Sequence, residues 1–290
     1  MKPISLFLLV WFASCGISAA DKKVVFCAGS TSHGPREHEF RAGCLLLAKC
    51  LEGIPGITTV VASNGWPADV RVFDGASAVI LYADGGSGHP AIRPERLKLL
   101  NSLADQGVGI GAMHYGVEVP AGEPGFAMLN WTGGYFEMFW SVNPTWHATF
   151  PTLADHPITR GVKPFTINDE WYYHMRFAPN MEGVTPILST VPPKQTLDRP
   201  NGPHSGNPFV RAAVRRGEAQ HLMWAFERKT GGRGFGFTGG HYHKNWAQDD
   251  FRKLTLNAIL WISNAEIPEA GVASSVTSDD LDRNLDIKRR

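Results

Sequence analysis

Short apolar runs alternate with amphipathic segments through the first part of the chain. Residues 22–29 (KKVVFCAG), 57–63 (ITTVVAS), 76–86 (ASAVILYADGG) and 108–116 (VGIGAMHYG) are apolar or β-branched runs bounded by turn residues, which predicts strands. Residues 35–53 and 93–107 carry apolar side chains at helical spacing between a proline and a glycine, which predicts helices. Strands separated by helices of this length predict an α/β domain with a mainly parallel central sheet.

The second half of the chain has a different character. Residues 133–150 are rich in aromatic side chains, and a proline-rich loop follows near residues 192–208. Residues 220–228 and 232–240 predict two late strands, and residues 249–264 predict a final helix. Because no repeat or strong linker divides the chain, we expect one domain over residues 21–265. Residues 266–290 form a polar tail that we expect to dock loosely, with one short helix.

The first residues predict a cleavable export signal over residues 1–20. They combine Lys2, an apolar run from Ile4 to Ala13, and small residues at Ser18 and Ala20. The run is too short to span a bilayer, which takes ~20 apolar residues, and no other stretch predicts a span. The letters FASCG also resemble a lipoprotein cleavage box, with Cys15 as the acylated residue. We therefore expect a periplasmic or secreted protein, with a membrane-anchored lipoprotein as the alternative.

Composition and charge limit the classes of protein to which this chain can belong. Apolar residues make up 43% of the chain and charged residues 19%, which is typical of a folded globular protein. The formal net charge is +1, so the sequence gives no indication of nucleic-acid binding. Beyond Cys15, the cysteines Cys27, Cys44 and Cys50 are odd in number, and buried free thiols are the simplest expectation.

Polar residues suited to catalysis follow the predicted strands. In a parallel sheet, ligands bind beyond the carboxyl ends of the strands. Four residues occupy such positions: His33, Asp84, His89 and His114. Two more histidines, His241 and His243, stand in the motif GGHYH after the last strand. An imidazole at a strand end is either solvated or has a nitrogen facing a cation or a substrate proton. For the group as a whole we favour a functional role.

Aromatic residues lie in or beside the same loops. Sugar rings stack on aromatic faces, which favours a carbohydrate cleft, although aromatic side chains under long loops often only bury area. We expect the substrate to contact Tyr135, Trp171 and Tyr242. Asp84, followed by GGSGH, is a fourth candidate for substrate binding, with turn capping as the alternative.

Three stretches in this order resemble the ThuA-like (trehalose utilisation) family. They are VGIGAMHYG, HPITRGV followed by INDEWYYH, and GRGFGFTGGHYHKNW. The resemblance covers roughly residues 23–263 and implies a three-layer, flavodoxin-like or class I glutamine amidotransferase-like domain. Amidotransferases of this fold place a cysteine at the strand-to-helix elbow and a late His-x-Glu motif. Here the elbow residue is His114 and the late motif is His241-Tyr242-His243, so thiol-dependent glutamine hydrolysis is not expected.

Two mechanisms remain for this set of residues. The first is a divalent zinc or manganese site with His33, His114, His241 and His243 as ligands, where His241 and His243 would share one face of an extended backbone. The second is metal-free acid–base catalysis by His114, Glu170 and His241. Glu170 and His174 would be neighbours if that segment were helical. No nucleotide cofactor is expected.

The resemblance implies an exported protein of carbohydrate catabolism. As an enzyme it would act on a glycoside or keto-sugar derivative, and hydrolase, lyase and isomerase activities all stay open. The alternatives are a non-catalytic sugar-binding protein and a component of a surface complex. The expected partner is a small carbohydrate, and homo-oligomer formation is left open.

Overall fold

Seven strands form one sheet at the centre of the protein, whose computed structural model describes residues 21–288. The order is β2-β1-β3-β4-β11-β10-β9, and all neighbouring pairs are parallel except those of β10 with β11 and with β9. The strands are β1 Lys22–Ala28, β2 Ile57–Ala62, β3 Ala76–Tyr82, β4 Gly109–Met113, β9 Val184–Thr190, β10 Gln220–Glu227 and β11 Arg233–Phe237. The expected export signal over residues 1–20, with Cys15, lies outside the described residues.

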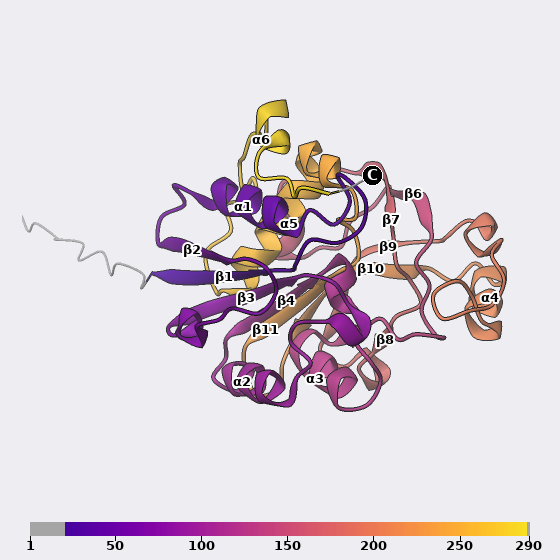
Figure 1. Ribbon diagram of the computed structural model, residues 1–290. Helices are drawn as coiled ribbons and strands as arrows, with labels where there is room; N and C mark the ends of the chain where they lie inside the picture. Colours follow the sequence, from indigo (N-terminus) through magenta and orange to yellow (C-terminus); the bar gives the residue numbers. More distant parts are fainter. Residues whose placement is uncertain (1–20, 289–290) are drawn as a thin grey trace, which may run out of the picture.

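Helices cover both faces of the sheet. Figure 1 shows α1 (Phe40–Leu51) and α5 (Asp249–Ile262) on one face, with α2 (Pro94–Asp105) and α3 (Glu123–Thr132) on the other. Alternate residues of a strand point to opposite faces, so Val24 and Phe26 join the core beneath α1 and α5, while Val25 and Cys27 join the opposite core. The prediction of a three-layer α/β domain with a mainly parallel sheet is confirmed.

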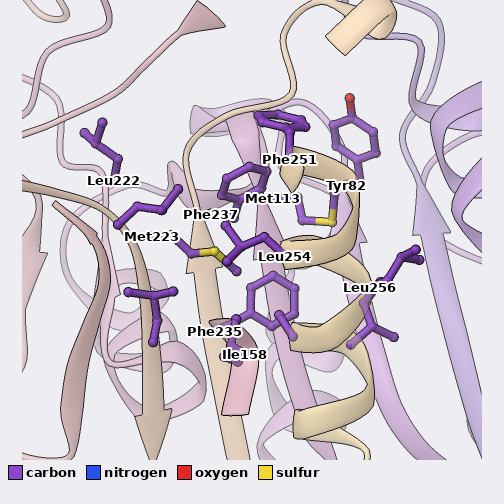
Figure 2. Close-up of a cluster of buried hydrophobic side chains, with 14 of the residues drawn as sticks. Tyr82, Met113, Ile158, Leu222, Met223, Phe235, Phe237, Phe251, Leu254 and Leu256 are labelled. Carbon is purple, nitrogen blue, oxygen red and sulfur yellow. The ribbon is translucent and has the colours of Figure 1, made fainter. Parts of the chain in front are cut away.

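The core beneath α5 is built from long side chains of the helix and of the central strands. Phe251 and Leu254 of α5 pack over Met113 of β4 and over Phe235 and Phe237 of β11 (Figure 2). All five side chains are fully buried. Burial of each contributes ~1.5–3 kcal/mol relative to exposure, so this contact fixes α5 firmly against the sheet.

A second group of elements extends the carboxyl end of the sheet. Strands β6 (Thr145–Phe150) and β7 (Phe165–Glu170) form an antiparallel hairpin in which Thr145 pairs with Glu170. Short strands β5 (Gly134–Tyr135) and β8 (Arg176–Phe177) pair with each other, and α4 (Pro208–Arg215) and α6 (Ser278–Asp282) complete the elements. Single 3-10 turns are η1 Val70–Phe73, η2 Gly86–Gly88, η3 His114–Val117, η4 Pro157–Thr159, η5 Pro179–Met181, η6 Lys194–Leu197 and η7 His243–Ala247.

The first helix starts later than its sequence pattern predicts. We expected a helix from Pro35, but α1 begins at Phe40. The reason is a looped backbone in which Arg36 and His38 have φ values of 67° and 45°, which a right-handed helix excludes. The residues before α1 therefore form a separate loop beyond the carboxyl end of β1.

The C-terminal segment packs more tightly than expected. Its short helix α6 was anticipated, but Ile267 and Val272 are buried in the core beneath α5. At the end of this segment, Lys288 Nζ lies 3.2 Å from a carboxylate oxygen of Glu39, and both side chains are almost fully buried. The segment thus clamps the loop that precedes α1.

Two other expectations concern the state of the cysteines and the presence of membrane-spanning helices. Cys27, Cys44 and Cys50 are free, with the first two buried, as predicted. Burial raises the pKa of Cys27 to about 12, so this thiol is a poor nucleophile. Across residues 21–288, none of the helices has the length and apolar character needed to traverse a membrane.

Candidate functional site

Four side chains from separate parts of the chain converge above the carboxyl ends of the central strands. His38 comes from the loop before α1, His114 from the end of β4, Glu170 from the end of β7 and His241 from the loop after β11. One ligand atom from each lies within 4.8 Å of the others. We refer to His38, His114, Glu170 and His241 as the His/Glu cluster.

The ring nitrogens of this cluster lie at hydrogen-bonding distances from one another. His38 Nε2 is 3.0 Å from both His114 Nε2 and His241 Nδ1, and the latter two are 3.3 Å apart. Glu170 Oε2 lies 3.2 Å from His241 Nδ1 and 3.6 Å from His114 Nε2. Three imidazoles and one carboxylate thus face a common point.

Backbone geometry explains how the His114 ring reaches the centre. His114 has a φ of 49° at the strand-to-turn elbow, which directs its ring over the end of the sheet. Such a conformation is uncommon outside glycine and costs of order 1–3 kcal/mol. The elbow is tight, because a Cβ on Gly116 would come within 2.7 Å of the Leu81 carbonyl oxygen.

A buried carboxylate holds the loop that carries His241. Asp169 accepts hydrogen bonds from the backbone N–H groups of Gly240 (2.7 Å) and His241 (3.0 Å), and from Asn245 Nδ2 (3.0 Å). Because Asp169 precedes Glu170 on β7, one strand supplies both a cluster member and the support for another. This arrangement fixes His241 relative to Glu170.

Hydrogen bonds outside the cluster fix the tautomers of two imidazoles. His114 Nδ1 lies 2.9 Å from the Thr238 carbonyl oxygen, which can only accept, so Nδ1 carries the proton. His38 Nδ1 lies 3.2 Å from Asp84 Oδ1 and is likewise the donor. In their neutral forms both rings therefore present a bare Nε2 lone pair, and these atoms are 3.0 Å apart. Two facing lone pairs repel unless a donor or a cation satisfies each of them. His241 Nδ1 lies 3.0 Å from His38 Nε2, and the Tyr172 hydroxyl lies 3.2 Å from His114 Nε2.

Protonation of His38 or His114 is not expected to relieve the repulsion between their Nε2 lone pairs. Burial, followed by the nearby His33 and His241, lowers the pKa of His38 to about 2. Burial also holds the pKa of His114 well below its usual value, and the neighbouring His38 adds to the effect. Both rings thus stay neutral, as metal ligands must be.

His241 and Glu170 form the charged pair of the cluster. Burial is the largest single influence and opposes the charge on each, but their mutual hydrogen bond and the neighbouring charges together outweigh it, raising the pKa of His241 and lowering that of Glu170. The Tyr172 hydroxyl lies 3.2 Å from Glu170 Oε2 and from His114 Nε2. A hydroxyl donor is therefore available beside the carboxylate.

Asp84 and His33 lie beside the cluster on its solvent side. Asp84 Oδ1 accepts hydrogen bonds from Ser32 Oγ (2.9 Å) and from His38 Nδ1. The His33 ring stacks on that of His38 at 3.5 Å between centroids, and its Nδ1 is 3.7 Å from Asp84 Oδ1. We expected Asp84 to bind substrate and His33 to bind metal. In the structure Asp84 supports His38. His33 lies outside the four-residue cluster but forms a second group with His38 and Asp84, whose ligand atoms lie within 4.8 Å of one another.

His243 also lies apart from the cluster. The extended backbone expected through His241 and His243 is wrong, because His243 begins the 3-10 turn η7 and its N–H donates to the Arg36 carbonyl. The two rings therefore do not share a strand face. The helix that would make Glu170 and His174 neighbours does not form, because Glu170 ends a strand and the His174 ring bonds to the Trp140 carbonyl.

Of the aromatic residues expected to bind substrate, some are buried in the core and one lies beside the His/Glu cluster. Trp171 is fully buried against Phe237 and Phe251, which leaves it no surface for a sugar. Tyr135 is 5% exposed and its hydroxyl donates to Glu137. Tyr242 is half-buried, with its ring 4.6 Å from that of His241, and is the aromatic candidate that stays beside the cluster.

Sequence reasoning missed His38. The sequence pattern places it on the first turn of a helix and leaves open whether it faces solvent or the site. In the structure it is 0% exposed and contacts both other histidines of the cluster. Its one signal was its position in the loop SHGPREHEF after the first strand, the same signal that pointed to His33. His89, which also follows a strand, instead bonds to the Gly116 carbonyl and to the Ala91 N–H, a structural role.

Two solved structures of ThuA-like proteins share this fold. A ThuA-like protein from Bacteroides uniformis superposes with a TM-score of 0.58 and 15% identity, covering 87% of this chain and 95% of that one. One from Parabacteroides merdae gives a TM-score of 0.52 at 15% identity, with 89% and 94% covered. A glutamine amidotransferase from Thermotoga maritima gives 0.42 at 8% identity, with 85% and 100% covered. No curated protein matches this sequence. The ThuA family model, described as trehalose utilisation, matches residues 33–262, and the chain therefore belongs to the ThuA family.

Proposed function

We propose that this protein is an exported enzyme of carbohydrate catabolism that acts on a glycoside or keto-sugar derivative at a divalent metal centre. His38, His114, Glu170 and His241 would hold the ion, with zinc and manganese as the ions that suit three imidazoles and one carboxylate. The family description supports the link to sugars. The N-terminal residue pattern supports export.

One observation carries the metal assignment. The bare Nε2 lone pairs of His38 and His114 face each other at 3.0 Å, and their partners Asp84 and Thr238 prevent either ring from turning its N–H inward. A divalent cation would convert this repulsion into two coordinate bonds. Three imidazoles and one carboxylate therefore offer a donor set that fits a divalent metal, which would replace the donors now beside these lone pairs, His241 Nδ1 and the Tyr172 hydroxyl.

The chemistry of such a site follows from its burial. A bound divalent ion would supply Lewis acidity toward a sugar hydroxyl or carbonyl. Glu170, whose side chain is 19% exposed, would hold or receive a proton on Oε1, the oxygen that does not face His241 and His114. The Tyr172 hydroxyl would donate to an oxygen held beside Glu170. The buried walls of the cluster would exclude bulk water and strengthen these interactions.

The proposal is tested on untagged protein purified without chelators. We expect near-stoichiometric zinc or manganese, and turnover within a panel of glycosides and keto-glycosides that is lost on metal removal and regained on re-addition. A matched pair of variants, His114→Gln in the cluster and His147→Gln on the exposed face of β6, separates the site from general effects. Metal-free protein with full thermal stability and full activity would overturn the metal mechanism.

A further inference from the structure

A cavity of about 320 Å³ opens directly beside Glu170. Its polar lining includes Asn143, Thr145, Gln195 and Arg199, and Trp146 forms part of an apolar wall. This volume lies at the small end of ligand pockets, which span ~300–1,000 Å³, and suits a ligand the size of a small sugar. None of the residues that sequence analysis assigned to substrate binding lines this cavity.

Glu170 joins the cavity to the His/Glu cluster through its two oxygens. Oε2 faces His241 and His114, whereas Oε1 accepts a hydrogen bond from Asn143 Nδ2 at 3.1 Å. A ligand in the cavity would therefore contact the same carboxylate that completes the cluster. This connection marks the cavity as the place where the reacting part of a substrate can reach the cluster.

A guanidinium group stands at the exposed side of this cavity. Arg199 Nη2 donates to Asn143 Oδ1 (3.1 Å) and to the His204 carbonyl (3.2 Å). Its side chain is exposed, and within residues 21–288 it forms no ion pair with a carboxylate. These two bonds orient the guanidinium while leaving its other nitrogens available to a ligand. A planar guanidinium held in this way matches the geometry of a carboxylate.

We propose that the cavity is the substrate subsite and that it selects a sugar bearing a carboxylate, which Arg199 binds. Hydroxyl groups of the ring would bond to Asn143, Thr145 and Gln195, whose side chains offer both donors and acceptors. The sugar carboxylate would lie at the Arg199 end, away from the anionic Glu170. This inference rests on the proposed function, because it takes the His/Glu cluster as the reaction centre.

The test compares D-glucuronate with D-glucose, which share one ring and differ in the carboxylate. Binding of each is measured by ligand-observed NMR and calorimetry to the wild-type protein and to Arg199→Met. We expect the wild-type protein to prefer glucuronate by about tenfold or more, as a charge-assisted hydrogen bond to an ion would give. Arg199→Met should lose this preference while keeping its affinity for glucose. Arg215→Met, on the exposed side of α4, should behave as wild type.

The outcomes separate this inference from the proposed function. Equal affinities in the wild-type protein, no binding of either sugar, or a preference that survives Arg199→Met would each overturn the subsite. A role of Arg199 in merely holding Asn143 would change both affinities together and would also overturn it. Metal content is measured on the same preparations. A preserved preference in protein that binds no metal would overturn the proposed metal mechanism and leave the subsite standing.

Discussion

His38 Nδ1 lies 3.2 Å from Asp84 Oδ1, so a half-exposed carboxylate sets the tautomer of a fully buried imidazole. Carboxylates in this position beside metal-binding histidines increase ligand basicity and fix the ring. The relationship makes Asp84 a positioning residue for the cluster.

We therefore expect Asp84→Asn to weaken binding of the proposed metal ion about 10–100-fold, the usual effect of losing such a partner. The amide still accepts a hydrogen bond but without charge, and it can turn its NH₂ group toward His38. Zinc affinity is measured by competition with a chromophoric chelator. Asp198→Asn, at an exposed position, is the control and should bind as wild type. Equal affinity for Asp84→Asn and wild type would contradict the positioning role.

Metal binding should also raise thermal stability through His38. At metal concentrations ~100 times the Kd, binding stabilises the folded state by ~2.7 kcal/mol, or about 5–10 °C in Tm for a protein of this size. We expect His38→Gln to lose this shift. His147→Gln removes an exposed imidazole and should keep it. The measurement is the difference in Tm with and without zinc within each variant, and a full shift in His38→Gln would argue against His38 as a ligand.

The buried pair of Lys288 and Glu39 should matter for stability. Lys288 Nζ also donates to the backbone carbonyl of Glu37, so it supports the loop that carries His38. Removing one partner of a buried pair leaves an unpaired charge, and we expect Lys288→Met to cost about 3 kcal/mol. Lys229→Met, which breaks the exposed pair with Glu182, should cost less than about 1 kcal/mol. Denaturant unfolding measures both.

A second variant separates charge from packing in this pair. Combining Glu39→Gln with Lys288→Met removes both charges, so part of the lost stability should return. A double variant that is as unstable as the sum of its single changes would show that the two residues act independently.

Gly43 on α1 should resist replacement by alanine. In an exposed helix this change stabilises by up to about 1 kcal/mol. Here the added Cβ would lie 2.7 Å from the Tyr82 ring and 3.3 Å from Trp246 Nε1, both buried. We expect Gly43→Ala to destabilise the protein by about 1–3 kcal/mol, as overpacked cores do. Unfolding in denaturant provides the test, and unchanged or increased stability would contradict the packing argument.

The pair of His204 and Glu118 should give a pH-dependent contribution to stability. The hydrogen bond to Glu118 at 3.0 Å raises the pKa of His204, despite partial burial. Because the folded pKa lies above the unfolded value of ~6.5, the stabilisation is complete below that value and is lost as pH rises through the folded pKa. His204→Gln should therefore cost up to about 1 kcal/mol near pH 5 and little near pH 9. A cost that does not vary with pH would contradict this assignment.

Local sequence patterns determined the layers of this protein. The period of apolar residues in β1, β3 and β4 and the spacing in α2 and α5 report burial within one element, and these elements formed where they were expected. The same rule places His114 at a strand end, because ligand-facing positions of a parallel sheet follow its strands. The sequence alone therefore predicted the fold class, and it predicted that the site lies at the carboxyl ends of the parallel strands.

Tertiary structure decided which side chains meet at that edge. His38 and His241 are separated by 203 residues, and no local period reports a contact that depends on how the loop before α1 lies beside the loop after β11. The left-handed backbone at His38 breaks the helical pattern, so a residue expected on the first turn of a helix lies at the centre of the cluster. Trp171 shows the opposite case. We expected it in a substrate cleft, but it packs against Phe237 of β11 and Phe251 of α5 in the core. The period of apolar residues reports whether a residue is buried within its own helix or strand. Which distant residues it contacts depends on the path of the whole chain.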